Sequence, residues 1–134
     1  MINKKERKKN TFIFIAGMIF YLLNRFVIKK LDMEGIIGYI LSCHFNDFCG
    51  GLTILAYINI MLSYSKYSYI HITKLFTSIM IALLCGVFWE YIFPFVFPRG
   101  TPDPLDLVAY CFGGFVFSVI HSIWHKKAQR KDIL

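Results

Sequence analysis

Residues 73–93 read TKLFTSIMIALLCGVFWEYIF, and this stretch decides the fold class. From Leu75 to Trp89 it carries no charged side chain, and its one acidic residue is Glu90. At 1.5 Å per residue, a helix of this length crosses the roughly 30 Å hydrocarbon core of a bilayer. The stretch therefore predicts a transmembrane helix.

Three further apolar stretches are long enough, or nearly so, to cross a bilayer, at about residues 11–28, 47–64 and 105–124. The chain has 134 residues, 57% of them hydrophobic, and its mean hydropathy of +0.55 is too high for an ordinary soluble domain. We predict an all-α fold, in which residues 1–134 form a single polytopic domain built as a bundle of four transmembrane helices. Lipid is then the first expected partner, and an oligomer is compatible with so small a bundle.

The segment Gly35 to Cys43 (GIIGYILSC) is apolar but too short to cross the bilayer. We interpret it as an interfacial or re-entrant segment. The alternative merges it with the second span and places Asp47 in mid-membrane, where unpartnered polar groups are costly.

Two glycine pairs lie inside predicted spans, Gly50-Gly51 in the second and Gly113-Gly114 in the fourth. Small residues let helix backbones approach closely in a membrane. The pairs therefore predict that the second and fourth helices cross at these positions.

The net charge of +7 indicates topology rather than nucleic-acid binding, because the basic residues lie in tails and short loops. Cytoplasmic loops collect Lys and Arg. With both termini in the cytoplasm, the outer side receives only Arg25, Lys29, Lys30 and Arg99. Richness in Lys, Ile, Asn, Tyr and Phe is typical of an AT-rich bacterial genome, so we expect a multi-pass protein of the bacterial cytoplasmic membrane.

This orientation collects polar side chains from four segments at the outer interface, and together they form the predicted ligand-binding site. They are Arg25, His44, Asn46, Asp47, Glu90, Arg99, Asp103 and Asp106. Three other histidines, His71, His121 and His125, fall in the cytoplasmic half, where we expect them to snorkel or to cap helix ends.

Glu90 needs a partner, because a carboxylate within an apolar helix is costly. Arg99 is the natural one, since a proline-rich loop is expected to end the third helix and return the chain to Asp106. The prolines are Pro94, Pro98, Pro102 and Pro104. An arginine fork can bridge two carboxylates and still donate to a phosphate. The alternative is that these charges only tie down the loop.

No zinc site is predicted, because His44, Asn46, Asp47 and Cys49 come from one short helical start and cannot all face one point. Carboxylate oxygens do suit hard cations. A Mg²⁺ or Ca²⁺ ion bridging Asp47, Glu90 and Asp106 to an anionic head group is therefore a hypothesis, and no other cofactor is expected.

The last third of the chain resembles the VanZ-like family of small bacterial membrane proteins, and His44 to Gly51 resembles it loosely. The matching residues are Glu90, Phe95, Pro98, Arg99, Asp103, Asp106, Ala109 and Gly113. The sequence departs from the family at Phe93, where Gln is frequent, and at Tyr110, where Asn is usual. The resemblance implies a fold and a membrane location. One branch of the family is associated with glycopeptide-antibiotic tolerance.

Three functions fit these features. The first is a non-enzymatic protein that recognises an anionic lipid or cell-envelope precursor head group, with Arg99 as the anion contact. The second is a membrane enzyme acting on a lipid-linked substrate, with His44 or a carboxylate as general base. The third is a small ion-coupled transporter, which would have to oligomerise. The sequence has no GxSxG, Walker, HExxH or dinucleotide motif, which favours the first.

Overall fold

The structure is a computed structural model that describes residues 2–31, 33–97 and 101–132. In this part of the chain the regular secondary structure is helical throughout, as predicted. In chain order the elements are α1 (Ile2–Phe26), the 3₁₀-helix η1 (Ile28–Lys30), α2 (Gly35–Cys43), α3 (Phe45–Tyr64), α4 (Leu75–Val87), the π-helix η2 (Phe88–Ile92), α5 (Phe93–Val96) and α6 (Pro104–Asp132).

Four helical stretches among the described residues are long and apolar enough to cross a membrane, which confirms the number predicted. They are Lys4–Lys30, Phe45–Tyr64, Leu75–Val96 and Pro104–Arg130. The first and last helices are longer than predicted, because α1 already begins within the basic N-terminal segment and α6 continues through the basic C-terminal one. Hydropathy marks the apolar part of a helix, not the charged turns that extend it.

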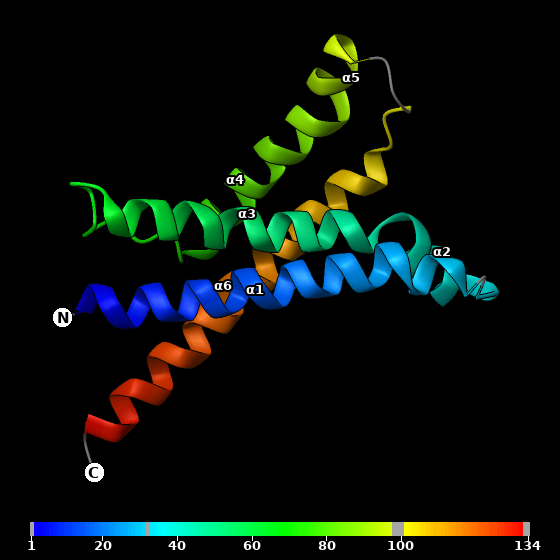
Figure 1. The fold of residues 1–134 in the computed structure, drawn as a ribbon. Helices are drawn as coiled ribbons and strands as arrows, with labels where there is room; N and C mark the ends of the chain where they lie inside the picture. The colour runs from blue at the N-terminus through cyan, green and yellow to red at the C-terminus, as the bar shows by residue number, and fades with distance from the viewer. Residues whose placement is uncertain (1, 32, 98–100, 133–134) are drawn as a thin grey trace.

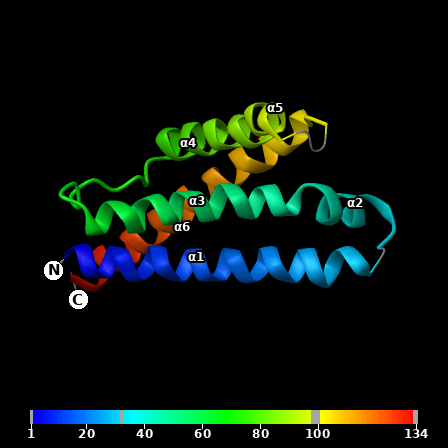
Figure 2. The same ribbon diagram turned by 45° about the horizontal axis from the view of Figure 1, so that its top comes forward.

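The long helices do not form a square bundle of parallel helices, because some of them cross at an angle (Figure 1). α1 and α3 lie side by side, α6 packs across α3, and α4 packs against α6. Both termini lie at one end of the molecule, and α2 and the end of α5 lie toward the other (Figure 2). This arrangement agrees with an even number of spans.

The core is small and lies where α1, α3, α4 and α6 meet. Its buried apolar residues are Ile13, Leu52, Leu55, Ala56, Ala82 and Phe117. Many large apolar side chains point outward instead, such as Phe76, Leu84 and Val108. In water this surface would be costly, whereas in a bilayer acyl chains cover it.

The predicted crossing of the second and fourth spans is confirmed at the glycine pairs. A Cβ atom on Gly51 of α3 would lie 2.3 Å from the backbone oxygen of Tyr110 in α6. A Cβ atom on Gly113 of α6 would lie 2.4 Å from the backbone oxygen of Phe48 in α3. The two backbones therefore touch at a place where only glycine fits.

The third span passes Pro94 and ends at Val96, before Pro98, so it reaches slightly beyond its predicted end at about residue 93. The helix continues through Pro94 to Val96, because the π-helix Phe88–Ile92 precedes the proline. A proline inside a regular α-helix clashes with the carbonyl four residues earlier. A π-helical turn changes this register, and such turns occur frequently at functional sites. Glu90 lies within it.

The short apolar segment forms a helix of its own, α2, and its interfacial or re-entrant place in the membrane stays a prediction. Gly35 begins it with a φ of +84°, a left-handed backbone that suits glycine. α2 ends at Cys43 and α3 begins at Phe45, so the alternative of one merged span is wrong. His44 is the residue between the two helices.

Candidate functional site

His44 and Asp106 form the central contact of the site. His44 sits at the junction of α2 and α3, and Asp106 lies in the first turn of α6. The crossing of α3 and α6 at the glycines brings these two helix starts together. The imidazole Nδ1 lies 2.6 Å from the Asp106 carboxylate oxygen Oδ1. The sequence places both at one depth, and the structure places them in contact.

Asp103 lies beside this pair and directly precedes α6. Its carboxylate accepts a hydrogen bond of 2.9 Å from the backbone N–H of Leu105, and its carbonyl accepts one from Asp106 N–H. These bonds satisfy N–H groups that a helix start leaves open. One ring nitrogen of His44 and one carboxylate oxygen from each of Asp103 and Asp106 lie within 4.8 Å of one another. That spacing suits a single cation.

The second ring nitrogen of His44 has no partner among the described residues. His44 is 9% exposed, and its Nε2 atom is buried without a hydrogen bond. A buried polar atom left unpaired costs about 1–3 kcal/mol. When Nδ1–H donates a hydrogen bond to the Asp106 carboxylate, Nε2 is left with a lone pair that can bind a ligand group.

Two further carboxylates are the near electrostatic neighbours of this pair. The half-buried Asp47, in the first turn of α3, interacts with Asp106, Glu90 and His44. Glu90, from the π-helix, interacts with Asp106 and Asp103. The site therefore gathers four carboxylates and one imidazole from three spans, and like charges this close repel one another unless a cation or protons offset them.

The other predicted site residues lie elsewhere. Asn46 accepts a hydrogen bond of 2.8 Å from Asn24, which also donates to the backbone oxygen of Leu41. Asn24 thereby joins α1 to α2 and α3. Arg25 is exposed and donates to the Tyr21 hydroxyl at 3.3 Å. Arg99 lies outside the described residues, so its predicted contact with Glu90 stays a prediction.

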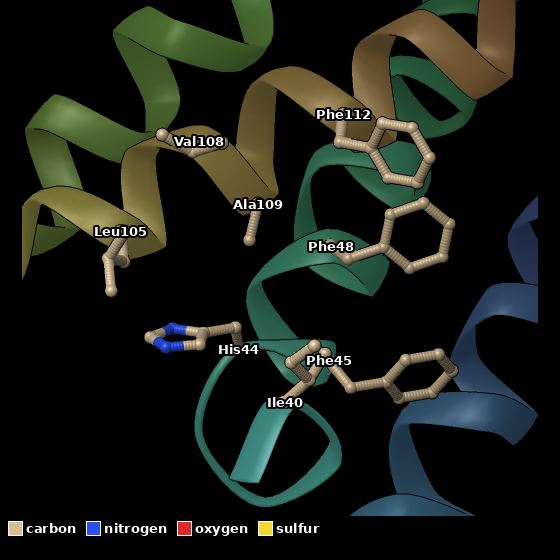
Figure 3. Close-up of a pocket in the computed structure, with 8 residues that line it drawn as sticks. All are labelled: Ile40, His44, Phe45, Phe48, Leu105, Val108, Ala109 and Phe112. Carbon is tan, nitrogen blue, oxygen red and sulfur yellow. The ribbon is translucent and has the colours of Figure 1, made fainter. Parts of the chain in front are cut away.

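An apolar groove opens directly beside His44 (Figure 3). It has a volume of about 490 Å³ and lies between the α2–α3 junction and the start of α6. Besides His44 its walls are Ile40, Phe45, Phe48, Leu105, Val108, Ala109 and Phe112. Several of these side chains, such as Val108 at 63% exposure, are exposed, so the groove opens onto the outer surface of the helices. Figure 3 shows the His44 ring projecting from the junction toward the start of α6, near Leu105.

A second polar cluster, at the terminal half of the bundle, does not follow from sequence analysis. Asn10, Asn59 and His121 are at most 5% exposed and bond to one another across α1, α3 and α6. The expectation that His121 snorkels or caps a helix is therefore wrong. The signal was available: each lies on the face of its helix that carries the core residues, at Ile13, Leu55 and Phe117.

Comparisons with known proteins identify no relative. No family model matches the chain, and no curated protein or solved structure matches it.

Proposed function

We propose that this multi-pass membrane protein binds a divalent cation at His44, Asp103 and Asp106, and through it the anionic head group of a lipid. The observation that carries the proposal is the buried His44 ring, which touches Asp106 through Nδ1 and keeps Nε2 unpaired beside an apolar groove. The two carboxylates suit Mg²⁺ and Mn²⁺, and the imidazole favours Mn²⁺ of the two.

The charge of the site supports a cation rather than direct binding of an anion. The four neighbouring carboxylates would repel a phosphate or carboxylate ligand. A bound divalent cation reverses this, because it offsets the carboxylates and keeps coordination positions for head-group oxygens. Arg99, if it reaches the site as the sequence predicts, would add donors to the same ligand.

The groove supports a lipid as the bearer of that head group. Ile40, Phe48 and Phe112 line a surface that continues from His44 onto the outer face of α6. An acyl or polyprenyl chain lying there would cover exposed apolar side chains such as Leu105 and Val108. One lipid would thus bind at both places, with its head group on the cation and its tail in the groove.

The lipid that co-purifies with the protein tests this function. In native mass spectrometry from a mild detergent with Mg²⁺, we expect the wild type to retain an anionic lipid that EDTA releases. His44→Gln should lose this EDTA-sensitive lipid, because it removes the imidazole at the centre of the site. Glu34→Gln removes an exposed carboxylate near the start of α2 and should behave as the wild type. A wild type whose lipids do not respond to EDTA would overturn the proposal.

The contact between His44 and Asp106 also favours a second function, an enzyme that acts on a lipid-linked substrate. Asp106 would hold the imidazole so that Nε2 serves as general base. Turnover of a labelled lipid-linked phosphate ester by the purified wild type, lost in Asp106→Asn and kept in Glu34→Gln, would select this function. No observation favours transport. The buried side chains of Leu55, Ala56 and Phe117 fill the space between the two polar clusters.

We further propose the membrane orientation that the basic residues predict, with the termini in the cytoplasm of a bacterium and the His44 end outside. The VanZ-like resemblance stays a prediction that agrees with this location.

Thiol labelling tests the orientation. Cys43 is exposed at the His44 end, Cys49 is buried, and Cys85 and Cys111 are half-buried within spans. A membrane-impermeant maleimide added to intact cells should therefore label the wild type but not Cys43→Ser. Labelling that appears only after the cells are lysed would place the His44 end in the cytoplasm.

A further inference from the structure

A second hollow lies at the terminal half of the bundle, and its chemistry differs from that of the His44 site. It has a volume of about 490 Å³ and is enclosed by the start of α1, the segment before α4 and the second half of α6. Its polar lining includes Lys9, His71, Lys74, Ser118, Ser122 and His125. Asp106 and Ser122 both lie on α6, which at 1.5 Å per residue separates the two sites by roughly 24 Å.

The hollow carries a surplus of positive charge. Among its lining residues the only acid is Glu6, which is already paired with Lys9 of the same helix. Lys74 is exposed and makes no capping hydrogen bond at the start of α4. Its ammonium group, the imidazoles of His71 and His125 and the hydroxyl of Ser122 are all donors. These are the groups that bind phosphate oxygens.

The segment that carries two of these donors is fixed to the helices behind it. Asn59 donates to the backbone oxygen of Ile72 at 2.9 Å and accepts from its N–H at 2.8 Å. The Ser118 hydroxyl donates to the backbone oxygen of Thr73 at 2.8 Å. The backbone between His71 and Lys74 is therefore tied to both α3 and α6, and a fixed backbone lowers the entropy cost of binding.

The buried cluster of Asn10, Asn59 and His121 lies behind this segment and fixes the helices that line the hollow. Asn10 accepts hydrogen bonds from Asn59 at 3.4 Å and from His121 at 3.2 Å. Nδ1 of His121 lies 3.6 Å from the Glu6 carboxylate. Three spans thus present one preformed polar surface at the end where the chain's basic residues concentrate.

From this geometry we infer a second binding site, in which Lys74, His71, His125 and Ser122 bind a phosphate group. The phosphate belongs either to a phospholipid head group or to a water-soluble phosphate compound, because the hollow lies at the end of the spans, where both are within reach. The site needs no metal, since the ammonium group of Lys74 supplies the positive charge. It is separate from the cation site proposed for His44.

Calorimetric titration of the detergent-solubilised protein with inorganic phosphate, in EDTA, tests the site. We expect binding that weakens about tenfold or more in Lys74→Gln, because a charge-assisted hydrogen bond is lost. Lys4→Gln removes an exposed lysine of α1 that does not line the hollow, and should leave the affinity unchanged. Asp106→Asn should also leave it unchanged, so failure of the cation site and failure of this one are distinguishable.

Native mass spectrometry in EDTA identifies the source of the phosphate. Retention of added dioleoylphosphatidylglycerol by the wild type and its loss in Lys74→Gln would indicate a lipid head group, and binding of inorganic phosphate alone would indicate a soluble ligand. If neither phosphate nor this lipid binds, or if Lys74→Gln binds as the wild type does, the hollow is not a phosphate site.

Discussion

Gly51→Leu is expected to prevent the protein from folding to a stable bundle. A Cβ atom at this position would lie 2.3 Å from the Tyr110 backbone oxygen and 3.0 Å from its Cα atom. Backbone atoms of α6 cannot move aside as the end of a flexible side chain can. The two helices would have to separate, which would disrupt the contacts of Leu52 and Leu55 in the core. Overpacking of this kind costs about 1–3 kcal/mol for modest changes, and leucine is not a modest one.

Thermal unfolding in detergent, followed by the fluorescence of Trp89 and Trp124, measures this effect. We expect Gly51→Ala to lower the midpoint clearly and Gly51→Leu to elute as an aggregate in size-exclusion chromatography. Thr77→Leu adds similar bulk at an exposed position of α4 and should unfold as the wild type does. A Gly51→Leu protein that is monodisperse and melts with the wild type would show that α3 and α6 do not cross here.

The crossing could be predicted from the sequence because two glycine pairs in apolar helices carry their own physical meaning. The same holds for the four spans, since length and hydropathy alone define them. α2 could be recognised because GIIGYILSC is too short to span. These features depend on local composition and not on how a helix is rotated about its axis.

For the candidate site, the sequence predicted only the depth of each residue in the membrane. The sequence puts His44, Asp47, Glu90 and Asp106 near one interface, but whether they touch depends on the crossing angle of α3 and α6. Asn46 is adjacent to Asp47 and yet bonds to Asn24 of α1, because successive residues of a helix face different neighbours. Hydropathy alone cannot show that Asn46 and Asp47 face different helices.

The network of Asn10, Asn59 and His121 was missed for a related reason. Asn59 and His121 each stand among apolar neighbours within a predicted span, whereas Asn10 directly follows basic residues and lies outside the predicted span 11–28. The helical spacing from core residues indicates that all three face inward, but their contacts with one another follow only from how α1, α3 and α6 pack. The continuation of the third helix past Pro94 could not be predicted, because the π-helical turn before it has no sequence signature of its own.

Asp106→Asn is expected to weaken divalent-cation binding by about 100-fold or more, the second large effect. Asp106 supplies one of the three ligand groups and also contacts His44 at 2.6 Å, so the change removes a charge and releases the imidazole. Loss of a residue that only supports a metal ligand already costs about 10–100-fold in affinity. Loss of a ligand that also supports another should cost at least as much. At 1.4 kcal/mol per tenfold, this is about 2.8 kcal/mol.

Titration of Mn²⁺ into the purified protein, followed by the electron paramagnetic resonance signal of the free ion, is the most direct measurement of the cation site. The signal of free Mn²⁺ should disappear until about one equivalent is bound by the wild type and by Glu34→Gln, and should persist from the start in Asp106→Asn. If the wild type leaves Mn²⁺ free, or if Asp106→Asn binds it equally well, then His44, Asp103 and Asp106 do not hold a cation and the proposed function is wrong.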